Sequence, residues 1–266
     1  MRFLGHSTMR MELAGTVVLT DPILTGRVGP LRRVGPPPVP GDYADADLVL
    51  ISHLHADHLH VRSLRKLPPT ALVVVPAGAG HWLRGRGIRR VAELAPGKEI
   101  VVGDLRVTGV PAKHSGHRWG PRSTRGPQAQ AMGHLLETPD GRVYVSGDTD
   151  LFPGMAELAE PRIDVALLPV WGWGTSLGPG HLDPVRAAEA VALLRPRVAV
   201  PVHWGTLALA GLTRVPGGPG ARMRRLLVEP PHEFAAAVAG GTTAVVLARP
   251  GAEVALTSPA PGPVGS

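Results

Sequence analysis

Cysteine is absent from this 266-residue sequence, and lysine and aromatic residues are scarce. Without cysteine the chain can form neither a disulfide bond nor a thiolate metal site. No apolar run approaches the roughly 20 residues that span a bilayer, and no basic-then-apolar signal segment opens the chain. We therefore expect a soluble cytoplasmic protein with no transmembrane segment.

The scarcity of lysine bears on the charge of the chain. Only Lys66, Lys98 and Lys113 occur among the 28 basic residues, so arginine supplies almost all of the basic charge behind the net +7. One interpretation is a surface background that follows from an arginine-rich composition, and the other is attraction of an anionic substrate. Because no basic run is interleaved with aromatic residues, we expect a small-molecule substrate and no nucleic acid. A homo-oligomer is compatible with the sequence.

Apolar residues, by contrast, are plentiful and lie in short segments separated by turns. No linker or internal repeat divides the chain, which predicts a single domain over residues 1–248. Residues 249–266 are rich in proline and glycine and are expected to form a flexible tail. The expected strands are 3–13, 16–20, 48–51, 71–75, 89–94, 99–102, 105–110, 132–137, 142–145, 163–168 and 198–201. The expected helices are 61–67, 78–86 and 183–194. Residues 23–45 are expected to form a long loop.

One stretch concentrates side chains that can bind metal. The apolar segment 48–51 runs directly into His53-Leu54-His55-Ala56-Asp57-His58, an H-x-H-x-D-H pattern. Residues two apart at a strand end can point the same way, so His53 and His55 can share one ion. Asp57 and His58 then lie on the following turn, where they can face a second ion. Imidazole and carboxylate together suit zinc and other borderline transition metals.

Three more metal-type side chains follow later apolar strands: His114, Asp148 and His203. Each of them alone is weak evidence for a metal site, because a single histidine after a strand is more often structural. Together with the four residues of the motif they make seven ligands, which suffice for two divalent ions. We expect Zn²⁺, with Mn²⁺ or Fe²⁺ as alternatives.

In this order the ligands resemble those of the metallo-β-lactamase superfamily. Within it the chain is most similar to the branch of N-acylphosphatidylethanolamine-hydrolysing phospholipase D and ascorbate-6-phosphate lactonase. The residues that carry the resemblance are Gly5-His6-Ser7-Thr8, Thr20-Asp21-Pro22, Pro36-Pro37-Pro38, 47–52, Ser146-Gly147-Asp148-Thr149, His181-Leu182-Asp183-Pro184 and His203-Trp204-Gly205-Thr206.

The resemblance implies an α/β fold, a four-layer αββα sandwich with two mixed β-sheets and the metals at one edge. It further implies that the seven ligands divide between the two ions, with Asp148 as the bridge. The first ion would be held by His53, His55 and His114, and the second by Asp57, His58 and His203.

Some positions depart from particular relatives. Ala56 stands where the phospholipase-like proteins usually have an aromatic residue, and no membrane-docking extension precedes the first strand, which argues against a phospholipid substrate. The lack of a helical C-terminal domain argues against a glyoxalase II. Asp148 argues against a true β-lactamase, and His55 in place of glutamate argues against the diiron oxygen-reducing relatives.

Residues outside the ligand set are candidates for support and substrate binding. Asp21 is expected to hydrogen-bond the metal loop. The residues expected to contact the substrate are His6, His117, Arg118 and Trp171, with Arg122 as a further basic residue of the same loop. For each of them a structural role is the alternative, and for His6 support of the metal site is a further one. His181 precedes an expected helix start, where its imidazole could protonate a leaving group or bind a phosphate oxygen.

Together these residues predict a metal-dependent hydrolase in which a metal-activated hydroxide attacks the substrate. Asp57 would orient this hydroxide. The first interpretation is a dinuclear hydrolase of phosphoesters or phosphodiesters. The second is a hydrolase of lactones, esters or amides, and the third a metal-binding protein without hydrolytic turnover. The first two use the same chemistry, so the motif does not choose between them.

Overall fold

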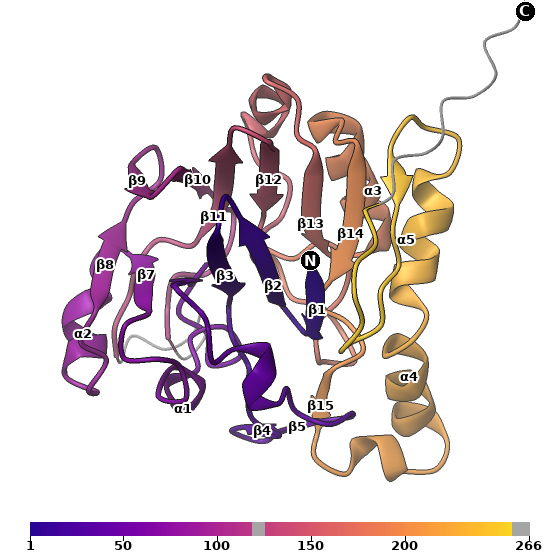
Figure 1. The fold of residues 1–266 in the computed structure, drawn as a ribbon. Coiled ribbons are helices and arrows are strands. Elements are labelled where there is room, and N and C mark those ends of the chain that lie inside the picture. The colour runs from indigo at the N-terminus through magenta and orange to yellow at the C-terminus, as the bar shows by residue number, and fades with distance from the viewer. Residues whose placement is uncertain (119–125, 257–266) are drawn as a thin grey trace, which may run out of the picture.

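The computed structural model describes residues 1–118 and 126–256, and two large sheets form its centre (Figure 1). Both sheets mix parallel and antiparallel neighbours. The first has the order β1 (Arg2–Gly5), β2 (Thr8–Leu13), β3 (Thr16–Thr20), β6 (Leu48–Leu50), β7 (Leu72–Pro76) and β8 (Val91–Leu94). The second has the order β16 (Ala244–Val245), β14 (Val198–Val202), β13 (Val165–Pro169), β12 (Gly141–Val145), β11 (Met132–Thr138), β10 (Leu105–Pro111) and β9 (Glu99–Val102).

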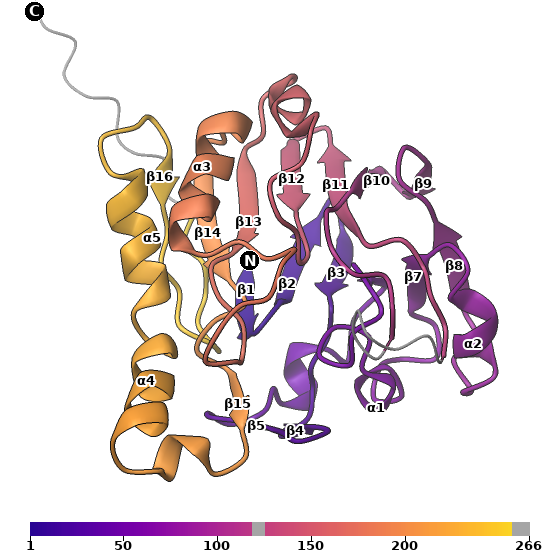
Figure 2. The same ribbon diagram turned by 180° about the vertical axis from the view of Figure 1, so that it is seen from behind.

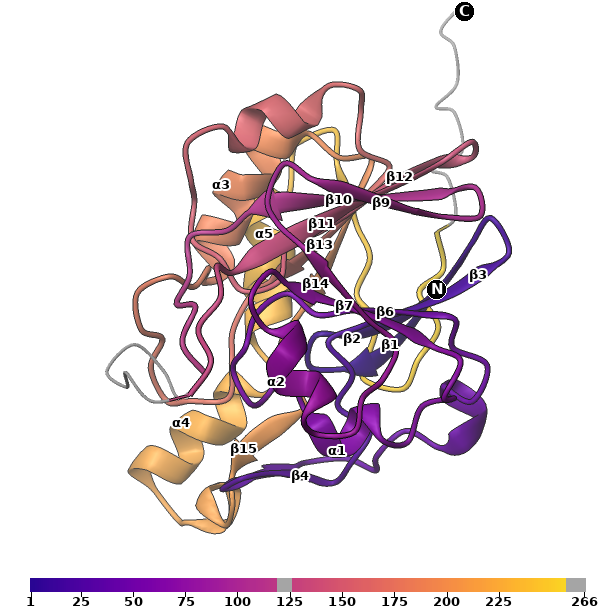
Figure 3. The same ribbon diagram turned by 90° about the vertical axis from the view of Figure 1, so that its left-hand side faces the viewer.

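Helices cover the outer face of each sheet, which confirms the expected αββα sandwich (Figure 3). The helices α1 (Val61–Leu64) and α2 (Gly80–Arg84) pack on the first sheet. The helices α3 (Pro184–Leu194) and α5 (Pro230–Val238) lie beside the second sheet, and α4 (Gly218–Leu226) precedes α5 (Figure 2). The described residues also form three short 3₁₀ helices: η1 (Pro40–Asp42), η2 (Met155–Ala159) and η3 (Leu212–Arg214).

Strand β6 shows why the metal motif starts where it does. Leu48 and Leu50 point into the core between the sheets, whereas Val49 and Ile51 pack on the other face, in the cluster that contains α1 and α2. A central strand buried on both faces reads as a continuous apolar run. The first polar residues after it therefore emerge at the edge of the sheet.

A third, smaller sheet was not expected. It has the order β15 (Leu207–Leu209), β5 (Leu31–Arg33) and β4 (Arg27–Val28), all antiparallel. The prediction of a continuous loop over 23–45 is therefore wrong. The strand that pairs with β5 lies far away in the chain, so no local pattern marks the pairing.

The residues after 248 begin in contact with the first strand. The backbone N–H of Phe3 donates to Ala252 O, and the N–H of Val254 donates to Met1 O. Residues 251–254, which belong to the expected tail, thus form hydrogen bonds with the N-terminal segment of the chain. The rest of that expected tail, residues 257–266, lies outside the described residues. Within the described part of the chain, no helix is long and apolar enough to cross a membrane.

Candidate metal centre

Three histidine rings from two strand ends converge on one point. His53 and His55 follow β6, and His114 follows β10. The Nδ1 atom of His55 lies 3.0 Å from Nε2 of His53 and 3.1 Å from Nε2 of His114. Two nitrogens at about 2.0–2.1 Å from one tetrahedral zinc are about 3.3 Å apart, so this group is close to the spacing that one ion requires.

A second group forms beside the first. The Nε2 atoms of His58 and His203 are 3.0 Å apart, and His203 follows β14. The Oδ2 atom of Asp57 lies 3.9 Å from Nε2 of His58 and 4.0 Å from Nε2 of His203. All three side chains are buried.

Asp148, at the end of β12, lies between the two groups. Its Oδ2 is 3.3 Å from Nε2 of His58, and its Oδ1 is 3.3 Å from Nε2 of His203. Its carboxylate also lies within metal-sharing distance of His53. The structure therefore brings the seven predicted ligands close together, with His6 beside the second group and His181 beside His114 and Asp148.

Hydrogen bonds to the far side of the rings fix which nitrogen faces the centre. Asp21 Oδ2 accepts from Nδ1 of His58 at 2.8 Å and from Ser52 Oγ at 2.6 Å. Since the Ser52 hydroxyl proton goes to Asp21, its oxygen accepts from Nδ1 of His53 at 3.0 Å. Asp21 thus occupies the supporting position expected of it, and Ser52, which the sequence analysis did not single out, extends that support to His53.

Backbone carbonyls orient two more rings, those of His114 and His203. Nδ1 of His114 donates to Gly180 O at 2.7 Å, and Nδ1 of His203 donates to Trp171 O at 2.6 Å. A carbonyl can only accept, so each Nε2 presents a lone pair to the centre. Both carbonyls belong to the glycine-rich loop after β13, whose backbone role carries no side-chain signal in the sequence.

This donor set fits divalent metal ions. In the first group, a single proton on Nδ1 of His55 can serve only one of the two nitrogens that face it, and the buried Nε2 of His55 has no hydrogen-bond partner among the described residues. Lone pairs that face one another in a buried site repel unless a cation lies among them. A metal ion meets this requirement for all three nitrogens at once.

The pKa values of the imidazoles favour metal binding in most of the set. Burial lowers the pKa of His55 to about 4 and that of His203 to about 3, with neighbouring histidines adding to the effect. Burial likewise places the pKa of His53 well below its ordinary value. Neutral imidazole is the form that binds metal, so these rings stay available as ligands at neutral pH.

The charged groups gather around the second group. Burial alone would lower the pKa of His58, but the carboxylates of Asp148 and Asp21 on either side raise it well above its ordinary value. Burial opposes ionisation of Asp57 and Asp148, yet the surrounding imidazoles keep the pKa of each carboxyl below its usual range. The field at Nε2 of His58 therefore favours a positive charge, which a proton or a metal ion can supply.

His6 lies at the back of this group and not at its surface. The ring is fully buried, and its Nε2 is 3.0 Å from Asp57 Oδ2. It lies against the ring of His203, with 3.9 Å between centroids. The expected contact of His6 with substrate does not fit this position, because no part of the ring reaches solvent.

The segment that carries His6 is joined to the segment that carries His203. The N–H of His203 donates to His6 O at 2.7 Å, and the N–H of His6 donates to Thr206 Oγ1 at 2.7 Å. Both histidines have a positive φ, 55° for His6 and 65° for His203. Such backbone costs about 1–3 kcal/mol for a non-glycine residue and persists only where the surroundings impose it.

Arg118 also differs from its expected role. Its Nη1 donates to Leu54 O at 2.6 Å and to Leu59 O at 2.7 Å, and the residue is buried. The guanidinium thus links Leu54 and Leu59, near the two ends of the metal loop. Burial lowers the pKa of Arg118 to about 10. A side chain held in this way is not placed to bind a substrate.

The other expected substrate contacts lie around the centre. His117 is partly buried and pairs through its backbone with Gln128. Trp171 is partly buried and donates from Nε1 to Gly174 O. Neither belongs to a group of potential ligands. Arg122 lies outside the described residues.

His181 stands at the outer side of the centre. Its Nδ1 donates to Gly178 O at 3.1 Å, so Nε2 faces Asp148 Oδ2, 3.6 Å away. The ring meets the ring of His114 edge-on at 4.7 Å, and a quarter of the side chain is exposed. The structure therefore places His181 next to the predicted ligands and in contact with solvent.

Comparison with known proteins agrees with this geometry. The β-lactamase superfamily domain matches residues 16–204. A UPF0173 metal-dependent hydrolase of Methanopyrus kandleri is 35% identical over 211 residues, covering 77% of this chain and 83% of the relative. An uncharacterised protein of Mycobacterium tuberculosis is 34% identical over 245 residues, covering 86% of this chain but 63% of that protein. This chain thus spans less than two thirds of the length of the mycobacterial relative.

A solved structure shows the same fold. Igni18, a metallo hydrolase of the archaeon Ignicoccus hospitalis, has a TM-score of 0.69 and 24% identity to this chain, with 94% of both chains covered. The match of the domain over most of the chain, the archaeal relative and the seven converging ligands lead to one conclusion. This chain belongs to the β-lactamase superfamily and, within it, to the UPF0173 metal-dependent hydrolases.

Proposed function

We propose that this chain is a dinuclear metal-dependent hydrolase that acts on a phosphoester or phosphodiester. His53, His55 and His114 would hold one ion, Asp57, His58 and His203 the other, and Asp148 would contact both. When bound, the ions polarise the substrate and make a water molecule easier to deprotonate.

The relation between His58 and His203 carries this proposal. Each ring donates from Nδ1 to an oxygen behind it, and their Nε2 atoms lie 3.0 Å apart beside the carboxylate of Asp148. Two such nitrogens and a carboxylate repel one another at these distances unless a cation lies among them. The same argument applies to the three nitrogens of the first group, which supports two ions and not one.

Residues of the chain supply the remaining steps. Asp57 stays anionic because the His6 hydrogen bond and nearby imidazoles outweigh the cost of its burial, and it orients the attacking water as a hydrogen-bond acceptor. His181 has its Nε2 at the outer side of the centre, where a proton on that atom can pass to the leaving oxygen. His6 positions Asp57 and does not touch the substrate.

A lactone, ester or amide hydrolase is the second candidate. The position of Arg118 favours it, because this arginine is committed to carbonyls of the metal loop and is not placed to pair with a phosphate. The motifs shared with the phospholipase D and ascorbate-6-phosphate lactonase branch are compatible with both candidates.

A substrate panel on the metal-loaded protein tests the proposal. We expect hydrolysis of bis-p-nitrophenyl phosphate that a chelator abolishes and that added Zn²⁺ or Mn²⁺ restores. Sugar-phosphate lactones, homoserine lactones and N-acylphospholipids form the other arm. Turnover of lactones alone would replace the first candidate by the second, and absence of any turnover with two ions bound would contradict both.

A further inference from the structure

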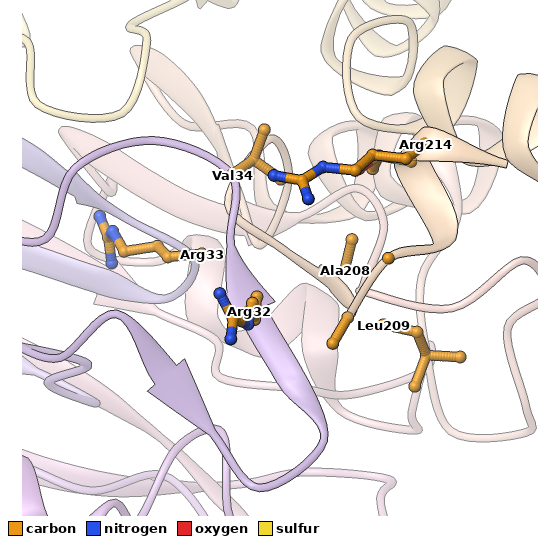
Figure 4. A pocket seen from close by; sticks show the side chains of 9 residues that line it. Arg32, Arg33, Val34, Ala208, Leu209 and Arg214 are labelled. Atoms are coloured by element: carbon orange, nitrogen blue, oxygen red, sulfur yellow. The ribbon is translucent and has the colours of Figure 1, made fainter.

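A groove of 560 Å³ lies at the small sheet (Figure 4). Its walls come from two distant parts of the chain, which β5 and β15 bring together. One wall is Arg32, Arg33 and Val34 at the end of β5, and the other is formed by residues 208–211, Thr213 and Arg214 of β15 and η3.

Both walls are basic. The sequence from Pro22 to Gly41 contains three arginines and no acidic residue, and the sequence from Trp204 to Val228 contains four arginines and no acidic residue. Pairing of β5 with β15 therefore joins two segments of like charge. Like charges on adjacent segments oppose their association, so this pairing concentrates positive potential that an anion would relieve.

Two of these arginines hold the walls in place. The half-buried Arg33 donates to the carbonyls of Leu4, Ile23 and Pro36, and it points away from Arg214 in the close view (Figure 4). Arg224 of α4 donates to Thr213 O and Val215 O, the carbonyls on either side of Arg214. The backbone that carries the groove is thus braced from both sides.

Two further arginines, Arg32 and Arg214, line the groove and are exposed. Among the described residues, no hydrogen bond or ion pair involves the side chain of Arg32 or Arg214. The side chain of Arg214 extends from η3 towards Val34 (Figure 4). Val34 is 53% exposed and Leu209 is 40% exposed, which places apolar surface beside the two charges.

We propose that this groove binds a small organic phosphate, with Arg32 and Arg214 contacting the phosphate and Val34 and Leu209 contacting the apolar part. Guanidinium groups pair with phosphate through two parallel hydrogen bonds, and two cations suit a doubly charged group better than a single carboxylate. The groove lies outside the metal centre, but its sheet contacts the centre. Ala56 of the metal loop packs on the cluster that contains Leu31 of β5 and Leu207 of β15, and Trp171 packs on the cluster of α4 and β15.

Calorimetric titration with phenylphosphonate tests this inference, because its C–P bond resists hydrolysis. The metal-loaded wild type is compared with the double variant Arg32→Gln/Arg214→Gln. Arg222→Gln is the matched control, since Arg222 lies on α4, is exposed, and does not line the groove. We expect the double variant to bind about tenfold or more weakly, because charge-assisted hydrogen bonds are lost. The control should match the wild type.

Binding at the groove should also weaken when sodium chloride is raised, since the two cations are exposed to screening. The uncharged diethyl phenylphosphonate should not bind. Equal affinity of all three proteins would show that phenylphosphonate binds only at the metal centre and would overturn the inference, as would absence of binding to the wild type. Metal content and melting temperature, measured on the same samples, verify that the variants are folded and loaded.

Discussion

The Nε2 atom of His6 lies 3.0 Å from the Oδ2 atom of Asp57, inside the protein and behind the metal centre. This contact ties the turn after β1 to the H-x-H-x-D-H loop. We predict that His6→Asn lowers metal affinity about 10–100-fold, the usual effect of removing a residue that orients a ligand. Asparagine tolerates the positive φ at this position but is too short to reach Asp57.

Chelator competition with the loaded protein measures this effect, and His117→Asn serves as the control because His117 is in none of the potential ligand groups formed by the described residues. A merely structural role would lower the melting temperature of the metal-free protein and leave affinity per folded molecule unchanged. That outcome would remove His6 from the support of Asp57.

His181→Ala should keep both ions and the melting temperature but lose turnover. The ring lies at the outer side of the centre and is not among the seven predicted ligands. Acid or base assistance by a positioned histidine is typically worth about 10²–10⁴-fold. The loss should be greatest for substrates with poor leaving groups and small for p-nitrophenolate, which needs no proton. Loss of metal instead of rate would show that His181 is itself a ligand.

Arg118→Met should destabilise the folded protein. The substitution keeps an apolar stem of similar length but leaves the carbonyls of Leu54 and Leu59 without their donor. Unsatisfied buried acceptors cost about 1–3 kcal/mol each, so we expect a fall of a few kcal/mol in the free energy of unfolding. Denaturant titration measures it, with the exposed Arg89→Met as control. Unchanged stability together with a higher KM would restore the substrate-binding role.

The buried His134, which is not one of the seven predicted ligands, predicts acid sensitivity of the fold. Burial lowers its pKa to about 4, and its Nε2 has no hydrogen-bond partner in the part of the chain that the structure describes. In the unfolded chain His134 becomes protonated below its ordinary pKa of about 6.5, whereas in the folded chain it becomes protonated only below about pH 4. Stability is therefore full above pH 6.5 and falls as the pH drops towards 4, by roughly 3 kcal/mol for this group.

The variant His134→Leu isolates this contribution. Wild type and variant, both with a chelator present, are unfolded by denaturant at pH 7.5 and at pH 4.5. The variant should lose less stability between the two pH values. An equal loss in both proteins would show that the acid sensitivity arises from other groups.

The strands that precede the predicted ligands could be recognised in the sequence for a physical reason, whereas the sandwich and the division of the ligands were implied by the family resemblance. Strands such as β6 are buried on both faces, so their apolar runs and the polar residues that follow stand out. The small sheet could not be predicted, because Arg33 pairs with Leu207 from the other end of the chain. The sequence analysis made no assignment for α4, α5, β15 or β16 either.

The sequence also could not predict the roles of residues that depend on the direction in which their side chains point. Arg118 follows His114 closely, yet its side chain turns inward to the metal loop. For His6 the sequence left substrate contact, support of the metal site and a structural role open, and the hydrogen bonds of its backbone with His203 and Thr206 turn the ring towards Asp57. Which way a side chain points depends on such long-range contacts, and no local spacing encodes them.

The number of metal ions per chain tests the central claim most directly. Protein reconstituted with excess Zn²⁺ and then freed of unbound metal is measured by elemental analysis, alongside Asp148→Asn. We predict close to two ions in the wild type, because two groups of donors meet at Asp148. The variant should hold fewer, since a neutral amide balances the charge of two ions poorly. One ion or none in the wild type, or two ions held equally well by Asp148→Asn, would contradict the dinuclear account.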